Sequence, residues 1–139
     1  MAFEIRKVQS DYFPKAKPKK RESYLSFIRS LPCVATGARS SVEAAHLSFH
    51  STRHGHYGRG KGTKAPDRWA LPLCADEHRR QHSMSEEAYW AQAGIDPHLM
   101  ALAIFGLWSD MGDQAYPQAE AIINMNLAAT GRLRDRSLA

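Results

Sequence analysis

The segment LPLCADEHRRQHS at residues 71–83 constrains the fold most, because a short apolar run leads directly into a polar stretch with two regularly spaced histidines. Such a run is typical of a buried strand, and the polar residues after Cys74 favour a helix. His78 and His82 are four residues apart, so a helix would place both imidazoles on one face, one turn apart. The segment therefore predicts a strand that runs into a helix with a paired histidine face.

Two imidazoles on one helical face are a common way to grip a single metal ion. We therefore expect His78 and His82 to bind one divalent metal. Imidazole ligands suit zinc and nickel, while turnover could use magnesium or manganese, so the metal identity stays open. The alternative is that both histidines only cover a basic helix face beside Arg79 and Arg80.

Length, charge and cysteine content limit the class of protein. The 139 residues allow about one domain, and the formal net charge of +5 suggests a polyanionic partner, although proteins that bind no nucleic acid can carry such a surplus. No apolar run reaches the ~20 residues of a membrane span, and the charged N-terminus is unlike a signal peptide, so we expect a cytoplasmic protein without a membrane partner. The two cysteines, Cys33 and Cys74, fit a reducing compartment as thiols or metal ligands.

The chain is predicted to have three parts. Residues 1–22 carry KAKPKKRE and are expected to form a basic, flexible arm in which prolines block regular structure. Residues 23–95 are expected to form an α+β core that opens with a short helix, starting near Glu22 and stopped by Pro32. Residues 96–139 are expected to be a helical extension packed on that core.

The helical extension has clear boundary signals. Asp96 followed by Pro97 is typical of an N-cap and first helical residue, and it opens a segment that is apolar nearly all round and should be buried. Pro117 similarly opens a helix that Gly131 closes. Before these, Ser83 and Glu86 have the spacing of a capping box for a helix that stops near Gly94.

A glycine-rich basic stretch, STRHGHYGRGKGTKAPDRW, lies between the predicted extended segment VEAAHL and the buried strand, and no acid occurs between Glu43 and Asp67. A flexible backbone with cations can approach a phosphate chain closely. The alternative is a plain surface loop. The residues predicted to contact nucleic acid are Arg53, Arg59, Lys61 and Lys64 in this stretch, with Arg79 and Arg80 beside the histidine pair.

Six of the seven histidines lie between residues 46 and 82. His46 ends the extended segment and is mostly neutral near pH 7, so it can accept a proton from water in phosphodiester hydrolysis. A structural role for His46 stays open. His54, His56 and His98 are expected to be hydrogen-bonded structural residues.

The string AAHL, the loop GRGKGTK, the run DRWALPLC and the closing histidines together resemble the HNH, or ββα-metal, nuclease superfamily over about residues 25–95. More narrowly, they resemble small phage and prophage proteins related to the recombination nuclease Ref. The resemblance implies a β-hairpin and a helix enclosing one divalent metal, with His46 as the base and His78 as a metal ligand. His82 is similar to the additional helix histidine of colicin DNases.

The chain also departs from the family pattern. Ala45 stands where many relatives have a metal-binding acid or histidine, so a ligand is missing unless His46, His50 or Asp67 supplies it. Trp69 stands at the position of the family asparagine, and Asp67, a little upstream, is expected to assist as a ligand or by orienting a histidine.

A second departure concerns structural zinc. Relatives often have two Cys-x-x-Cys pairs, and here Thr36 and Glu77 occupy the partner positions of Cys33 and Cys74. Two thiolates cannot form a four-cysteine zinc site.

These patterns together predict a small α+β, metal-dependent DNA endonuclease or nickase. The resemblance implies a phage or prophage role in recombination, with a RecA-coated strand as a further partner. Two other classes stay open, namely a catalytically inactive nucleic-acid-binding module with an HNH fold and a structural metal-binding phage protein. The sequence does not distinguish single- from double-stranded DNA, or DNA from RNA.

Overall fold

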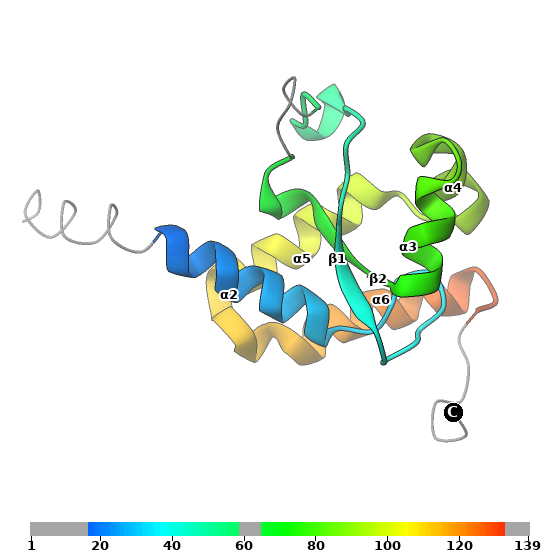
Figure 1. Ribbon diagram of the computed structural model, residues 1–139. Coiled ribbons are helices and arrows are strands. Elements are labelled where there is room, and N and C mark those ends of the chain that lie inside the picture. Colours follow the sequence, from blue (N-terminus) through cyan, green and yellow to red (C-terminus); the bar gives the residue numbers. More distant parts are fainter. Residues whose placement is uncertain (1–16, 59–64, 133–139) are drawn as a thin grey trace, which may run out of the picture.

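The structure is a computed structural model that describes residues 17–58 and 65–132, with side chains from residue 23 onward. Helices dominate it, and two short strands pair into one sheet, so the predicted α+β class is confirmed (Figure 1). In chain order the elements, with 3-10 helices written η, are α2 (Lys17–Ser30), β1 (Val42–His46), η1 (Thr52–His54), η2 (Asp67–Trp69), β2 (Ala70–Cys74), α3 (Ala75–His82), α4 (Glu86–Ala93), α5 (Pro97–Met111), η3 (Gly112–Ala115) and α6 (Tyr116–Ala129).

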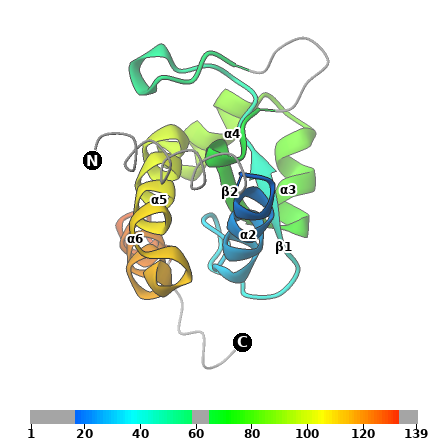
Figure 2. The same cartoon turned by 90° about the vertical axis from the view of Figure 1, so that its left-hand side faces the viewer.

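The sheet joins β1 and β2 antiparallel, in a register that runs from Val42 opposite Cys74 to His46 opposite Ala70. Both strands lie where the sequence predicts extended structure. Leu71 and Leu73 in β2 are fully buried, as expected of a strand that is apolar throughout. The sheet lies between α3 on one side and α5 on the other (Figures 1 and 2).

The step from β2 into α3 has a simple local cause. Cys74 keeps an extended backbone, with φ −66° and ψ 158°, and acts as the N-cap of α3. Asp76 and Glu77 then occupy the first turn, while Arg79, Arg80 and His82 occupy the last, which is the charge order that the helix dipole favours. The predicted strand-to-helix unit is therefore confirmed.

A single cluster of buried apolar side chains runs from α2 to α6, so the predicted core and the helical extension share one interior. Tyr24, Trp69, Ile104 and Leu127 are among its fully or almost fully buried members. Helix α5 is buried along one face only, since Leu99 is 57% exposed. The expectation that α5 is buried nearly all round is thus only partly correct.

One predicted helix start and one predicted helix cap were wrong. Helix α2 begins at Lys17 instead of near Glu22, because proline is compatible with the first turn of a helix and Pro18 does not block it. Helix α4 is capped by Ser85, whose hydroxyl accepts from the Ala88 amide, whereas the Ser83 hydroxyl donates to the Arg80 carbonyl at the end of α3.

The predicted cap of α5 is confirmed, because the Asp96 carboxylate accepts a hydrogen bond from the Leu99 amide.

In the described residues, each helix is too short or too polar to cross a membrane.

Candidate functional site

The first part of the candidate site lies at the end of β1. His46 Nε2 lies 2.8 Å from Asp67 Oδ1, and about a quarter or less of each side chain is exposed. A carboxylate can only accept a hydrogen bond, so the neutral His46 ring carries its proton on Nε2. Its Nδ1 then has a free lone pair. Asp67 is the first residue of η2, where Pro66 precedes it with φ −57°. The sequence-based expectation that Asp67 orients a histidine agrees with this contact.

The second part lies on α3. The Nε2 atoms of His78 and His82 are 3.1 Å apart, and His78 Nδ1 lies 2.8 Å from Glu43 Oε1. Two ligands of a tetrahedral zinc ion with ~2.0–2.1 Å bonds are ~3.3–3.4 Å apart, so the two nitrogens are nearly at ligand spacing. Glu43 accepts from Nδ1–H and leaves Nε2 unprotonated, which is the usual second contact of a metal-binding histidine.

These two parts are separate in the structure. Glu43 and His46 are three residues apart in β1, and residues at odd spacing in a regular strand point to opposite faces. In the part of the chain that the structure describes, no hydrogen bond or ion pair joins the His46 pair to the His78 group.

Ala45 and Trp69, the two residues that depart from the HNH pattern expected from the sequence, are both interior. Ala45 is 2% exposed and pairs with Leu71 across the sheet, and Trp69 is 1% exposed. No third His, Cys, Asp or Glu completes a three-ligand group around His78 and His82 within the described ranges. A metal at this pair would therefore take its remaining ligands from water or a bound phosphate.

A third group of histidines lies in the interior, between the turn at residues 51–56 and the start of α5. His56 Nδ1 is 3.0 Å from His98 Nε2, and His98 Nε2 is also 3.1 Å from the Phe49 carbonyl oxygen. His56 and Trp69 stack, with ring centroids 4.6 Å apart. His56 and His98 are 2% and 3% exposed, and both are hydrogen-bonded, as expected.

Burial sets the charge of this interior group. Burial, with the neighbouring His98, Arg68 and His50 charges acting in the same direction, lowers the pKa of His56 to about 4. Burial also lowers the pKa of His98, although its bond to the Phe49 carbonyl acts in the opposite direction. Both rings are therefore neutral at pH 7. The Nε2 atom of His56 has no hydrogen-bond partner.

His54 belongs to the same region but points to a carboxylate. Its Nδ1 lies 2.7 Å from Ser51 Oγ, and its Nε2 lies 4.0 Å from Asp96 Oδ2. His54, Asp96 and His98 each offer one ligand atom, and these atoms all lie within 4.8 Å of one another. This group could hold a metal ion. Reasoning from sequence missed it, because Asp96 reads as a helix cap and His98 lies far along the chain from His54.

The predicted phosphate contacts fall into three groups. Arg53 is exposed in η1, and Arg59, Lys61 and Lys64 lie outside the described residues. On α3, Arg79 pairs with Asp76, and Arg80 lies 3.4 Å from Glu77 Oε1 and donates to Gln92 Oε1. These two arginines therefore have intramolecular partners that a phosphate would have to replace.

The cysteine positions do not form a metal site. Cys33 is buried and Cys74 is half-buried with its Sγ 3.8 Å from Thr36 Oγ1, and burial raises the pKa of the Cys74 thiol. Glu77 accepts from the Tyr89 hydroxyl at 2.7 Å and pairs with Arg80. Glu77, which stands at a cysteine position of the expected HNH pattern, thus links α3 to α4 through Tyr89.

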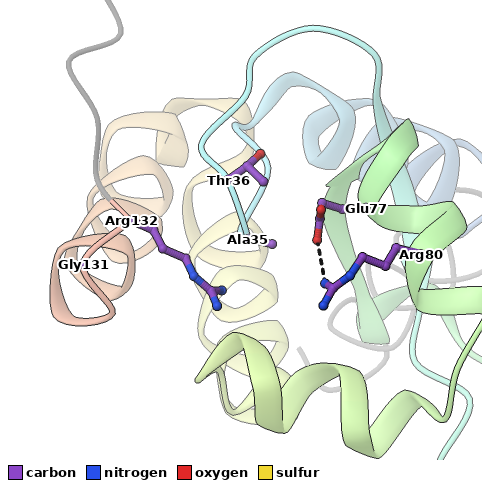
Figure 3. Close-up of a pocket in the computed structure, with 6 residues that line it drawn as sticks. All are labelled: Ala35, Thr36, Glu77, Arg80, Gly131 and Arg132. Atoms are coloured by element: carbon purple, nitrogen blue, oxygen red, sulfur yellow. Dashed lines mark hydrogen bonds and ion pairs between the residues drawn. The ribbon is translucent and has the colours of Figure 1, made fainter.

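A hollow of about 280 Å³ opens next to these residues, lined by Ala35, Thr36, Glu77, Arg80, Gly131 and Arg132 (Figure 3). Arg132 donates to the carbonyl oxygens of Ala93 and Gln92 at 2.9 and 3.1 Å. Because Arg80 is also paired, neither guanidinium group is free to bind an anion in the hollow.

The chain matches a protein-family model. A family model described as "Protein of unknown function (DUF968)" matches residues 10–105. No curated protein and no solved structure matches the chain.

Proposed function

Since the chain belongs to the DUF968 family, whose description names no activity, we propose from the geometry of the site that it is a metal-dependent DNA endonuclease or nickase with an HNH core. The observation that carries the proposal is the convergence of His78 Nε2 and His82 Nε2 to 3.1 Å, with Glu43 on the far nitrogen of His78. This arrangement has the donor spacing and the second contact of a two-histidine metal anchor.

The anchored ion would act as a Lewis acid on the scissile phosphate. It would offset the charge that builds up on the phosphate and leaving oxygens, and with only two protein ligands it would keep positions for water and substrate. The candidate ions are zinc, magnesium, manganese and nickel. The surface exposure of Glu43 and the partial exposure of His78, 51% and 21% of their side chains, leave room for a strand to approach.

His46 would be the general base. Its Nε2 side faces Asp67, so Nδ1 would take the proton from water, and Asp67 would stabilise the imidazolium that forms. The base and the metal act on different atoms of the reaction and need not touch one another. Because Glu43 and His46 lie on opposite faces of β1, the scissile phosphate would have to lie at the end of this strand, where the base and the metal can both reach it.

Positive side chains would hold the backbone of the substrate. Arg53 is available at the surface, and we assign Arg59, Lys61 and Lys64 to the same role by their sequence. Arg79 and Arg80 would contribute only after exchanging their present partners. Contacts of this kind carry no base information, so we expect little sequence preference.

A plasmid-nicking assay tests the proposal. Supercoiled plasmid is incubated with the protein in magnesium, manganese, nickel or zinc, with and without EDTA, and single-stranded circles are assayed bare and RecA-coated. We expect metal-dependent conversion to nicked or linear DNA. His46→Ala should lower the rate by roughly two or more orders of magnitude, whereas Gln118→Ala, an exposed change on α6, should not.

A catalytically inactive DNA-binding module is the second candidate. It is favoured by the buried Ala45, which leaves the histidine pair without a third protein ligand. DNA binding without cleavage in every metal, unchanged in His46→Ala, would decide for this candidate.

A further inference from the structure

The group of His54, Asp96 and His98 is built from two distant segments, and its members range from the buried His98 to the exposed Asp96. His54 is the last residue of η1, Asp96 is the N-cap of α5, and His98 lies in the first turn of α5. Their ligand atoms lie within 4.8 Å of one another. A single ion between them would fasten the turn at residues 51–56 to the start of α5.

Each member of the group has a contact on one of its polar atoms, which leaves the other polar atom for a ligand role. The Phe49 carbonyl accepts from His98 Nε2–H, which leaves Nδ1 as the unprotonated nitrogen of the neutral ring. His54 Nδ1 contacts Ser51 Oγ, and Asp96 Oδ1 accepts from the Leu99 amide, so His54 Nε2 and Asp96 Oδ2 face each other. Contacts of this kind fix the tautomer and direction of metal ligands.

The separation between His54 Nε2 and Asp96 Oδ2 is informative. At 4.0 Å it is too long for a hydrogen bond, yet it needs to shorten only by ~0.6 Å to match two ligands of one tetrahedral ion. The turn that presents His54 is itself well fixed. Ser51 and His56 exchange two backbone hydrogen bonds of 2.7 and 3.0 Å, and Gly55 closes the turn with φ +81°.

We infer that His54, Asp96 and His98 form a structural zinc site that fastens the 51–56 turn to the start of α5. Two imidazoles and one carboxylate are a donor set that zinc accepts. Water would complete the tetrahedron from the Asp96 side, where the carboxylate side chain is 46% exposed, whereas the His54 side chain is only 13% exposed. The positive end of the α5 dipole opposes a cation here, and the Asp96 charge offsets it.

His56 is a neighbour of this site and not a ligand. Its Nδ1 faces His98 Nε2, the nitrogen that also contacts Phe49, and its ring is stacked on Trp69. The site is therefore backed by packed aromatic rings, which suits a structural ion better than an exchanging one. This inference concerns the fold and does not depend on the proposed nuclease activity.

The test uses the full chain in a His82→Ala background, so that the α3 pair cannot bind the ion. The protein is stripped with EDTA, and zinc binding is followed by calorimetry and by melting temperature. We expect one equivalent of zinc and a rise of several degrees in melting temperature, because an ion that binds only the folded state stabilises it. Bound cobalt should show the visible absorption of a tetrahedral site.

Two further changes locate the site. His54→Ala should abolish the zinc-induced rise, and Asp96→Asn should weaken it at least tenfold in affinity while keeping a good N-cap side chain. Thr52→Ala, an exposed change in the same turn, is the matched control and should bind as the parent does. The inference is overturned if the His82→Ala protein binds no zinc, or if His54→Ala and Asp96→Asn bind it as tightly as the control.

Discussion

The chain uses histidine in two different ways in two neighbouring regions. The surface histidines, His46, His78 and His82, are partly or largely exposed, and His46 and His78 each contact a carboxylate. The interior histidines His56 and His98 are almost fully buried and contact each other, a backbone carbonyl and the ring of Trp69.

The two regions differ in how much solvent reaches the imidazole rings and in which groups contact them. A carboxylate beside a partly exposed ring orients one nitrogen and leaves the other open to water, metal or substrate. Burial among aromatic rings instead keeps the imidazole neutral and removes it from the reactants. Spacing in the sequence does not separate these cases, because His54 and His56 are as close to one another as metal ligands often are.

The interior region should be the more sensitive to loss of packing. Trp69→Ala removes a fully buried ring that stacks on His56 and meets His98 edge-on. We expect a loss of about 3–5 kcal/mol in the free energy of unfolding, measured by urea denaturation. Arg68→Ala, at the exposed position next to it, should cost far less. A Trp69→Ala protein as stable as its parent would remove the packing basis of the comparison.

Acid should destabilise the metal-free protein through the interior histidines. The pKa of His56 is lowered to about 4 in the folded state, while the unfolded chain titrates near ~6.5. The unfolded state therefore binds more protons between these values, and stability present above pH ~6.5 is lost as the pH falls toward ~4, by up to about 3 kcal/mol. Below pH ~4 this group contributes no further loss.

The measurement is the free energy of unfolding against pH, in EDTA. His56→Gln should flatten the fall between pH ~6.5 and ~4, with His98 contributing what remains. His82→Ala should keep the parent's slope, because that ring is exposed at the end of α3. Equal slopes in the parent and in His56→Gln would show that the buried ring does not carry the acid sensitivity.

The fold was largely predictable because its signals are local. The apolar run before Cys74, the Asp96–Pro97 cap and the prolines that open helices each act within a few residues. The error at α4 has the same origin, since Ser83 and Ser85 both precede the helix and only the backbone shows which one caps it.

The site was predictable only where its residues share one element. His78 and His82 face each other because α3 is a helix. The contacts of His46 with Asp67, of Glu43 with His78 and of His54 with the Asp96 region depend on how distant segments pack. No periodicity records such pairings, so the orienting role of Glu43 and the third histidine group could not be found from the sequence alone.

The two carboxylates of the surface region should affect different steps of cleavage. Asp67→Asn weakens the partner of the base, so we expect a fall of about 10–100-fold in the maximal rate. Glu43→Gln weakens the contact behind a metal ligand, so it should raise the metal concentration needed for half-maximal rate by a similar factor. Nicking assays at several metal concentrations separate the two. If both variants changed only the metal requirement, Asp67 would belong to the metal group and His46 would lose its role as an oriented base.

The smallest effect is expected from the basic stretch, where Lys61 and Lys64 lie outside the described residues. A cation that neutralises one phosphate of duplex DNA contributes about 0.9 to the slope of log affinity against log salt. The double variant Lys61→Ala, Lys64→Ala should therefore lower this slope by up to about 2, and the decrease should be the same for DNA of unrelated sequence.

The double variant Arg79→Ala, Arg80→Ala is the matched comparison. Because Arg79 and Arg80 already pair with Asp76 and Glu77, we expect a smaller change in slope. A larger change for the arginine pair would move the phosphate clamp from the loop to α3, beside the histidines that we propose to bind the metal.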